Sequence, residues 1–496
     1  MPGRILVIQM AKLGDFIQST PLLANLRRNH PGSQIILAGE QPAVLEAARL
    51  SPLVDDTLAR PDGAPAPVGD FEAVYTLNSH PRAMALASEV KAAARFGPTL
   101  ENGRPRYTPA QNFLMDLMRL DRRLGRFNLV DVWASLAEPS KPSPLVWPNP
   151  GTGPEGAGGG KFSGESPYFG STCLSDARSE LLRQNKERPE EIFPPPAPGE
   201  RPKLQSGRPA FKIGLQLGSK NHLRRWPVED FVSLSAELAA AGINFVPVLL
   251  GSADERALGR KFKKLLGGRA AEPINLIGAT DLQGLGAAVA GLDLLITADT
   301  GVMHLAAALR TPVLALFFGP AYGPETGPYG RGHIIYQALA PCAPCREGDG
   351  CRSRQCLNRP EPLRVARLAE DLLGTRPLAD EDSAEPWPEG HRVWRTEIDA
   401  FGQSLRPLRR PQLSRDEFLA LALTEAGREI IRPGYQMRAE QVASLIAAYQ
   451  VPAGLVFDPQ RLDQAPPVGR GHGPASFEKT RARALELAGA LGLEIA

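Results

Sequence analysis

The sequence predicts an α/β protein made of two doubly wound lobes, each a parallel sheet covered by helices. In residues 1–140 and again in residues 209–375, short apolar runs of strand length alternate with stretches of helical spacing. Between these regions, residues 141–208 are rich in proline and glycine, which is typical of a linker or a disordered insertion. Residues 376–496 hold further stretches of helical spacing, and we expect a mainly helical extension there.

Length and composition agree with this organisation. The 496 residues suit two to four domains at about 150 residues each. Hydrophobic residues make up 43% and charged residues 22%, which excludes a wholly disordered chain, a coiled coil and a collagen. The net charge of +3 is too balanced to indicate a nucleic-acid partner, and we expect none.

The first lobe is expected to begin with a buried strand at Ile5–Ile8. We do not interpret this run as a signal peptide, because polar residues interrupt it from Gln9 onward. The expected helices and strands that follow are Asp15–Asn29, Gln34–Ala38, Pro42–Leu50, Phe71–Leu77 and Arg82–Ala94.

The second lobe shows the clearer alternation. Its expected strands are Lys212–Leu217, Asn244–Leu250, Ile274–Ile277, Leu292–Thr297 and Val313–Phe318. Its expected helices are Val228–Ala241, Asp254–Leu266, Leu282–Ala290, Val302–Leu309 and Val365–Leu373. Ligands of such sheets bind beyond the carboxyl ends of the strands, so two lobes predict a cleft between them. Neither first strand is followed by a G-x-G-x-x-G or Walker A motif.

A carboxylate follows the first strand, in Lys12-Leu13-Gly14-Asp15. Asp15 fits two roles at this strand-to-helix turn. It can cap the helix, or it can act as a general base that takes a proton from an attacking hydroxyl. Because a helix N-terminus favours negative charge, we expect Asp15 to be ionised.

Small and polar residues open a helix after the strand Leu292–Thr297, in Asp299-Thr300-Gly301-Val302-Met303-His304. The free N–H groups of a helix start suit a diphosphate, and Gly301 lets the backbone approach it closely. His304 lies one turn into the helix and fits either a ligand contact or a structural role in the core.

Two further motifs follow strands of the second lobe. Gly218-Ser219 precedes Arg224 and Arg225, which can clamp a phosphate or form a solvated basic loop. Glu255 follows the glycine that ends the next strand, where an acidic side chain suits ribose hydroxyls.

Four cysteines are clustered at Cys342, Cys345, Cys351 and Cys356. Four thiolates with one C-x-x-C spacing suit a tetrahedral zinc or iron site of structural role, with reduced free thiols as the alternative. No catalytic metal is expected.

These motifs, in this order, resemble glycosyltransferase family 9, the ADP-heptose:lipopolysaccharide heptosyltransferases. The resemblance covers about residues 4–140 and 209–373. It depends on ILVIQMAKLGDFIQSTP at Ile5–Pro21, RRWP at Arg224–Pro227 and, above all, DTGVMHLAAAL at Asp299–Leu309. It implies the GT-B fold, two Rossmann-like lobes with the active site between them.

The resemblance also implies roles for particular residues. Asp15 matches the family's proposed catalytic base, and the loop Asp299–Gly301 matches the one that holds the donor's phosphates and sugar. Arg224 stands where the family usually has a phosphate-binding lysine, and the cysteine cluster is similar to one in other members. The full expected donor side is Ser219, Lys220, Arg224, Glu255, Asp299, Thr300, Gly301 and His304, and the expected acceptor side is Lys12, Gly14 and Gln18.

The expected function is an inverting, metal-independent transfer of a heptose-like sugar from a nucleoside diphosphate donor, ADP-heptose, to an acceptor hydroxyl. The acceptor is a glycolipid or another envelope glycan, with a protein as a further option. The expected location is cytoplasmic, at the inner face of the cytoplasmic membrane. Two alternatives keep the fold: a nucleotide-sugar 2-epimerase, which needs no acceptor, and a non-catalytic scaffold.

Overall fold

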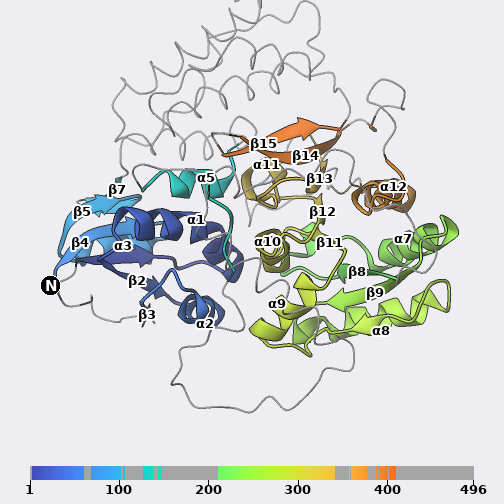
Figure 1. Ribbon diagram of the computed structural model, residues 1–496, viewed down its shortest axis with the longest axis horizontal. Helices are drawn as coiled ribbons and strands as arrows, with labels where there is room; N and C mark the ends of the chain where they lie inside the picture. The colour runs from blue at the N-terminus through green and yellow to red at the C-terminus, as the bar shows by residue number, and fades with distance from the viewer. Residues whose placement is uncertain are drawn as a thin grey trace, which may run out of the picture.

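The computed structural model describes residues 3–60, 67, 69–101, 104–106, 127–137, 143–147, 210–340, 357, 359–377, 387–388, 390–399 and 402–408. Figure 1 shows two α/β lobes side by side, with the first lobe in blue and the second in green to orange. The α/β architecture predicted from the sequence is confirmed.

The first lobe contains a parallel five-stranded sheet in the order β3-β2-β1-β4-β5. Its strands are β1 (Arg4–Ile8), β2 (Gln34–Gly39), β3 (Asp56–Ala59), β4 (Phe71–Thr76) and β5 (Ala92–Phe96). Its helices are α1 (Leu13–Asn29), α2 (Pro42–Leu50), α3 (Pro81–Glu89) and α5 (Leu129–Ala134), and β6 (Thr99–Glu101) pairs antiparallel with β7 (Arg104–Arg106). The apolar side chains of β1 are fully buried, as expected of a central parallel strand.

Four strands of this lobe, β3, β5, β6 and β7, were not expected. The helix expected at Arg82–Ala94 ends at Glu89, and the chain continues as edge strand β5. An alanine-rich run favours a helix by propensity, but pairing with β4 decides the outcome here. The guanidinium of Arg95 donates hydrogen bonds to the carbonyls of Ala87 and Val90, which fixes the turn between helix and strand.

The second lobe contains an eight-stranded sheet in the order β10-β9-β8-β11-β12-β13-β14-β15, in which β14 pairs antiparallel with both β13 and β15 and the other pairings are parallel. The strands are β8 (Phe211–Gln216), β9 (Phe245–Leu250), β10 (Ile274–Asn275), β11 (Leu294–Ala298), β12 (Val313–Phe317), β13 (Ile334–Ala338), β14 (His391–Asp399) and β15 (Gly402–Pro407). The α-helices are α7 (Val228–Ala240), α8 (Arg256–Leu266), α9 (Leu282–Ala290), α10 (Gly301–Ala308), α11 (Gly323–Thr326) and α12 (Pro362–Leu372). Two short 3-10 helices complete the lobe: η1 (His222–Arg224) and η2 (Ala253–Glu255).

The segment expected to be a mainly helical extension begins instead with β14 and β15, which extend the second sheet. Buried Val393, Trp394 and Thr396 alternate with less buried neighbours along β14, and Val393 pairs with Tyr336 of β13. Strand β13 itself was also not expected. The helical stretches expected at Arg415–Glu429 and Ala439–Tyr449 lie outside the described residues.

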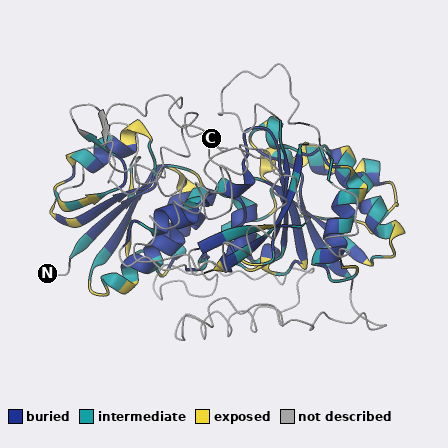
Figure 2. Ribbon diagram, turned by 90° about the horizontal axis from the view of Figure 1, so that it is seen from above, coloured by how far each residue is buried: buried dark blue, intermediate teal, exposed yellow. Residues whose placement is uncertain are grey.

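Apolar packing joins the two lobes. One hydrophobic core includes Phe16 and Ile17 of α1 together with Met303 and Leu305 of α10. Figure 2 shows the buried residues, in dark blue, running through both sheets and the helices between them. The start of the expected linker also packs, since the backbone N–H of Val146 donates to Thr20 Oγ1 and Trp147 lies against Gly286 of α9.

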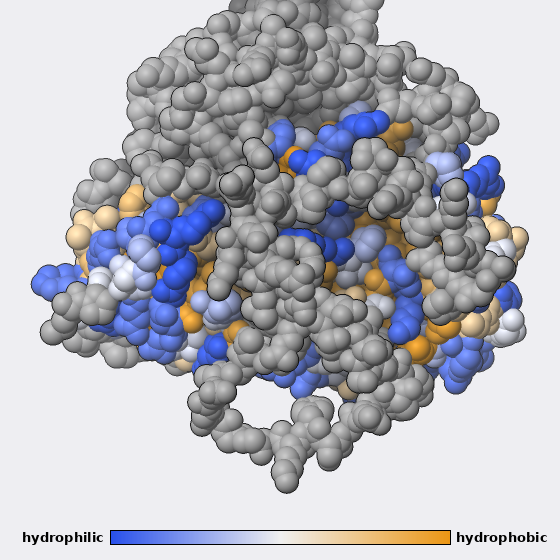
Figure 3. Space-filling view, viewed as in Figure 1, coloured by the Kyte–Doolittle hydropathy of each residue, from blue (hydrophilic) through white to orange (hydrophobic). Residues whose placement is uncertain are grey.

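The described surface is mainly polar. In the coloured part of Figure 3, hydrophilic residues are interspersed with hydrophobic ones, and Leu363 is the only large hydrophobic side chain that is exposed among the described residues. Within the described part of the chain, no helix is both long and apolar enough to span a membrane.

Candidate functional site

The first turns of α1 and α10, one from each lobe, are in contact. Each helix follows the carboxyl end of a central strand, β1 in the first lobe and β11 in the second. A Cβ on Gly14 would lie 2.8 Å from Cδ2 of His304 and 3.5 Å from Cα of Gly301, so this position requires a glycine. Two helix N-termini therefore approach the same interlobe region, where their dipoles favour an anion.

Asp15 occupies the first turn of α1 and is half-buried. Its Oδ2 accepts a hydrogen bond from the backbone N–H of Lys12 at 3.0 Å. Lys12, not Asp15, is the N-cap of α1, so Asp15 stabilises the helix start as the third helical residue of a capping box and not as the N-cap considered from the sequence. Burial raises the pKa of Asp15 above its ordinary value, against the opposing effects of the Lys12 N–H and of the Lys12 and Arg224 charges. The sequence argument considered only the helix N-terminus, which favours the ionised form. The raised pKa makes the ionised carboxylate a stronger base.

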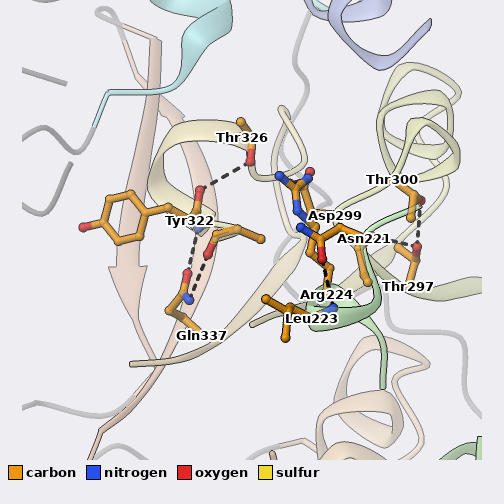
Figure 4. Close-up of polar contacts among 12 residues, drawn as sticks. Asn221, Leu223, Arg224, Thr297, Asp299, Thr300, Tyr322, Thr326 and Gln337 are labelled. Carbon is orange, nitrogen blue, oxygen red and sulfur yellow. Dashed lines mark hydrogen bonds and ion pairs between the residues drawn. The ribbon is translucent and has the colours of Figure 1, made fainter. Parts of the chain in front are cut away.

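An ion pair joins two of the expected donor-side residues. Arg224 Nη1 lies 2.7 Å from Asp299 Oδ2, and the two side chains are 20% and 9% exposed. Figure 4 shows Arg224 beside Asp299, in the loop region between η1 and the start of α10. Burial raises the pKa of Asp299 to about 6. Arg224 and the Thr326 side chain lower this pKa, whereas the charges of Asp15 and Glu325 raise it.

The start of α10 has no side-chain cap. Thr300 precedes the helix, but its Oγ1 lies 3.1 Å from Thr297 Oγ1 and makes no capping bond (Figure 4). Gly301 is the first helical residue. The N-terminus of α10 therefore keeps backbone N–H groups suited to a phosphate.

His304 lies at the contact between the two lobes. Its side chain is buried, and its ring edge lies against Gly14 of the other lobe. Burial lowers the pKa of His304 to about 3, so the ring is neutral at physiological pH. Its Nδ1 has no hydrogen-bond partner in the described part of the protein.

The remaining donor-side residues lie at the ends of β8 and β9. Ser219 is buried, and its carbonyl accepts a hydrogen bond from Arg225 Nε at 2.6 Å, while Lys220 is exposed. Glu255 Oε2 accepts from the Ser252 N–H at 2.8 Å and from Gln216 Nε2 at 3.3 Å. Glu255 thus caps the short helix η2, and it follows the end of β9.

On the expected acceptor side, Lys12 is exposed and Gln18 is buried one turn after Asp15. The Nε2 of Gln18 has no partner among the described residues. The four clustered cysteines lie outside the described residues. In the described remainder, no group of three His, Cys, Asp or Glu side chains could hold a metal ion.

Sequence reasoning missed Glu325 and Thr326, which act on Asp299 from α11. Both follow β12, so the carboxyl end of a third strand of the same sheet was the available signal.

The model of glycosyltransferase family 9 (heptosyltransferase) matches residues 180–354. Lipopolysaccharide heptosyltransferase 1 of Pseudomonas aeruginosa is 31% identical over 160 residues, which cover 31% of this chain and 43% of that protein. Lipopolysaccharide heptosyltransferase 2 of Salmonella typhimurium is 30% identical over 174 residues, covering 34% of this chain and 48% of that protein. The matched stretch thus spans less than half the length of these relatives.

A crystal structure of a family 9 glycosyl transferase from Veillonella parvula aligns with a TM-score of 0.50 and 20% identity. The alignment covers 75% of this chain and 98% of that one, which confirms the two-lobed GT-B fold. The family model and the two sequence relatives together show that residues 180–354 are similar to glycosyltransferase family 9.

Proposed function

We propose that this protein is an inverting glycosyltransferase that moves a heptose-like sugar from ADP-heptose to an acceptor hydroxyl in lipopolysaccharide or another envelope glycan. The observation that carries the proposal is the interlobe contact between α1 and α10. It brings a half-buried carboxylate of raised pKa, Asp15, near an arginine and an uncapped helix N-terminus. The two lipopolysaccharide heptosyltransferases among the relatives support the same reaction class.

In the proposed mechanism, Asp15 is the general base. Its carboxylate takes the proton of the acceptor hydroxyl while the hydroxyl oxygen forms a bond to the anomeric carbon. The bond from that carbon to the diphosphate breaks on the opposite face, so the configuration inverts. Lys12, Gly14 and Gln18 lie on the same helix or directly before it and form the proposed acceptor side.

The departing diphosphate would be stabilised from the second lobe. Arg224 and the start of α10 at Thr300 and Gly301 supply positive charge and N–H donors, and exposed Lys220 adds a second cation. Glu255, near the ends of β8 and β9, is the proposed partner of the ribose hydroxyls. His304 supports the α1–α10 contact through its ring edge.

We also propose that Cys342, Cys345, Cys351 and Cys356 bind one structural zinc or iron, since thiolates are soft ligands that suit these metals. The proposed location is cytoplasmic, at the membrane face where a glycolipid acceptor is available. A protein acceptor fits the same chemistry.

The reaction is tested by incubating purified protein with ADP-heptose and following ADP release with and without an acceptor. We expect release only with acceptor. Asp15→Asn removes the base, and Asp70→Asn is the matched control, because Asp70 forms an exposed ion pair with Lys91 in the same lobe. Equal activity of Asp15→Asn and Asp70→Asn would contradict the mechanism. Mass spectrometry of envelope glycolipid and protein from a deletion strain then identifies the acceptor.

A further inference from the structure

The Arg224–Asp299 ion pair is located where the proposed function requires a diphosphate. Asp299 immediately precedes Thr300 and the uncapped start of α10, and its Oδ2 lies 2.7 Å from Arg224 Nη1. The main cation proposed for the diphosphate thus already holds an internal carboxylate. A diphosphate that binds Arg224 at this position must compete with that carboxylate.

The groups around Asp299 are mostly acidic. From α1, Asp15 adds negative charge, and from α11, Glu325 does the same. Arg224 of η1 is a cation near two of these acids, and it lowers the pKa of both Asp15 and Asp299. The Thr326 side chain of α11 lowers the pKa of Asp299, His304 of α10 is neutral, and Lys12 lowers the pKa of Asp15.

We propose that the donor's diphosphate displaces Asp299 from Arg224 and that the freed carboxyl group takes up one proton from solvent. The neutral acid then donates a hydrogen bond to a phosphate oxygen of the bound donor. This inference rests on the proposed function, because it assumes that a nucleoside diphosphate binds here. One proton is consumed from solvent for each donor bound, and it returns to solvent when the diphosphate leaves.

Two electrostatic changes drive the proton uptake. Displacement removes the arginine that favours the ionised carboxylate, and the diphosphate brings negative charge close to it. Both changes disfavour a third negative group between Asp15 and Glu325. Even with Arg224 in place, burial already holds the pKa of Asp299 at about 6, so a further rise makes the acid neutral near physiological pH.

The test is isothermal titration calorimetry of ADP binding at pH 7.5, in two buffers with different ionisation enthalpies. The number of protons exchanged is compared between wild type and Asp299→Asn, because the amide has the same shape and cannot titrate. This comparison also cancels the protons that ADP itself exchanges. We expect wild type to take up close to one proton more per ADP than Asp299→Asn. We also expect Asp299→Asn to bind ADP several-fold more tightly, since the competing carboxylate is absent.

Asp15→Asn identifies which acid takes the proton. We expect Asp15→Asn to take up the same extra proton as wild type. If Asp15→Asn lost this proton and Asp299→Asn kept it, the assignment of the proton to Asp299 would be overturned. If Asp299→Asn fails to fold, the pH dependence of ADP affinity in the wild type still tests the inference. Above pH 7, ADP affinity should fall as pH rises, by at most tenfold per pH unit, up to the pKa of Asp299 in the complex.

Equal proton counts in wild type and Asp299→Asn, or a wild-type affinity that is flat between pH 7 and pH 9, would overturn the inference and leave the proposed function intact. Absence of ADP binding by the wild-type protein would instead overturn the proposed donor, and the inference with it.

Discussion

Replacing Gly14 with alanine tests whether the α1–α10 contact is required for transfer. The added Cβ would lie 2.8 Å from His304 Cδ2, whereas carbon atoms in contact prefer about 3.5–4.0 Å. The buried His304 ring has little room to move, and such overpacking costs about 1–3 kcal/mol. Alanine stabilises a helix by about 1 kcal/mol relative to glycine, which offsets part of this cost. Gly14 is only the second residue of α1, so less than this full amount is recovered, and we expect a net weakening of the lobe contact by about 1–2 kcal/mol.

The assay is the rate of ADP release with acceptor present, together with thermal unfolding of the same samples. A cost of 1–2 kcal/mol at the contact corresponds to a loss of about 5- to 30-fold in rate if only the joined form is active. Gly32→Ala is the matched control, because a Cβ there meets no atom within 4 Å. If Gly14→Ala kept a rate within twofold of Gly32→Ala, the contact would not be needed for the reaction, and the reasoning would be refuted.

Further predictions concern the base, its titration, the interlobe hydrogen bonds and the cysteines. Asp15→Asn should lower the transfer rate by about 10²- to 10⁴-fold and leave ADP affinity within a few-fold; a residual rate above about a third of wild type would make Asp15 only a cap. Because burial raises the pKa of Asp15 and the base must be ionised, the wild-type rate should fall as pH is lowered through that raised pKa, and a flat profile of log rate against pH would argue against the role. Tyr329→Phe removes a 2.6 Å hydrogen bond to buried Asp131 and should lower the free energy of unfolding by about 1–3 kcal/mol in denaturant titrations, with no change counting against this contact. Elemental analysis of untagged protein should find about one zinc or iron per chain, reduced in Cys345→Ser; metal-free protein of full stability would exclude the site.

Hydrophobic pattern was sufficient to predict most central elements of both sheets. Helix α9 was predicted with its observed bounds, Leu282–Ala290, and β12 was predicted to within one residue. The missed strands are β3, β5, β6, β7, β13, β14 and β15, which are edge strands, late strands or a separate short pair. Strand β5 has the alanine content of a helix, and β14 follows a region with no other strand signal. Their structure depends on pairing with residues far along the chain, which local periodicity does not reveal.

The arrangement of the candidate site residues could be predicted only in part, for a related reason. The position of Asp15 and of Asp299 after central strands could be predicted, because the carboxyl ends of parallel strands define the binding edge. The Arg224–Asp299 ion pair could not, since it joins side chains 75 residues apart across two loops. Nor could the contact of His304 with Gly14, which depends on how one lobe meets the other. Motif order indicates which residues share an edge, but not which of them neutralise each other.

Strand β15, although it lies late in the sequence, contacts the first lobe. Asp131, on α5 of the first lobe, accepts hydrogen bonds from Tyr329 Oη at 2.6 Å and from the Gln403 N–H of β15 at 2.9 Å. Buried Asn128 donates to the carbonyl of Gly327, directly after α11. Because α11 also carries Glu325 and Thr326, which act on Asp299, the same short helix links the lobe contact to the proposed diphosphate site. A change in how α5 meets β15 would therefore move the groups that set the charge of Asp299, which couples the relative position of the lobes to donor binding.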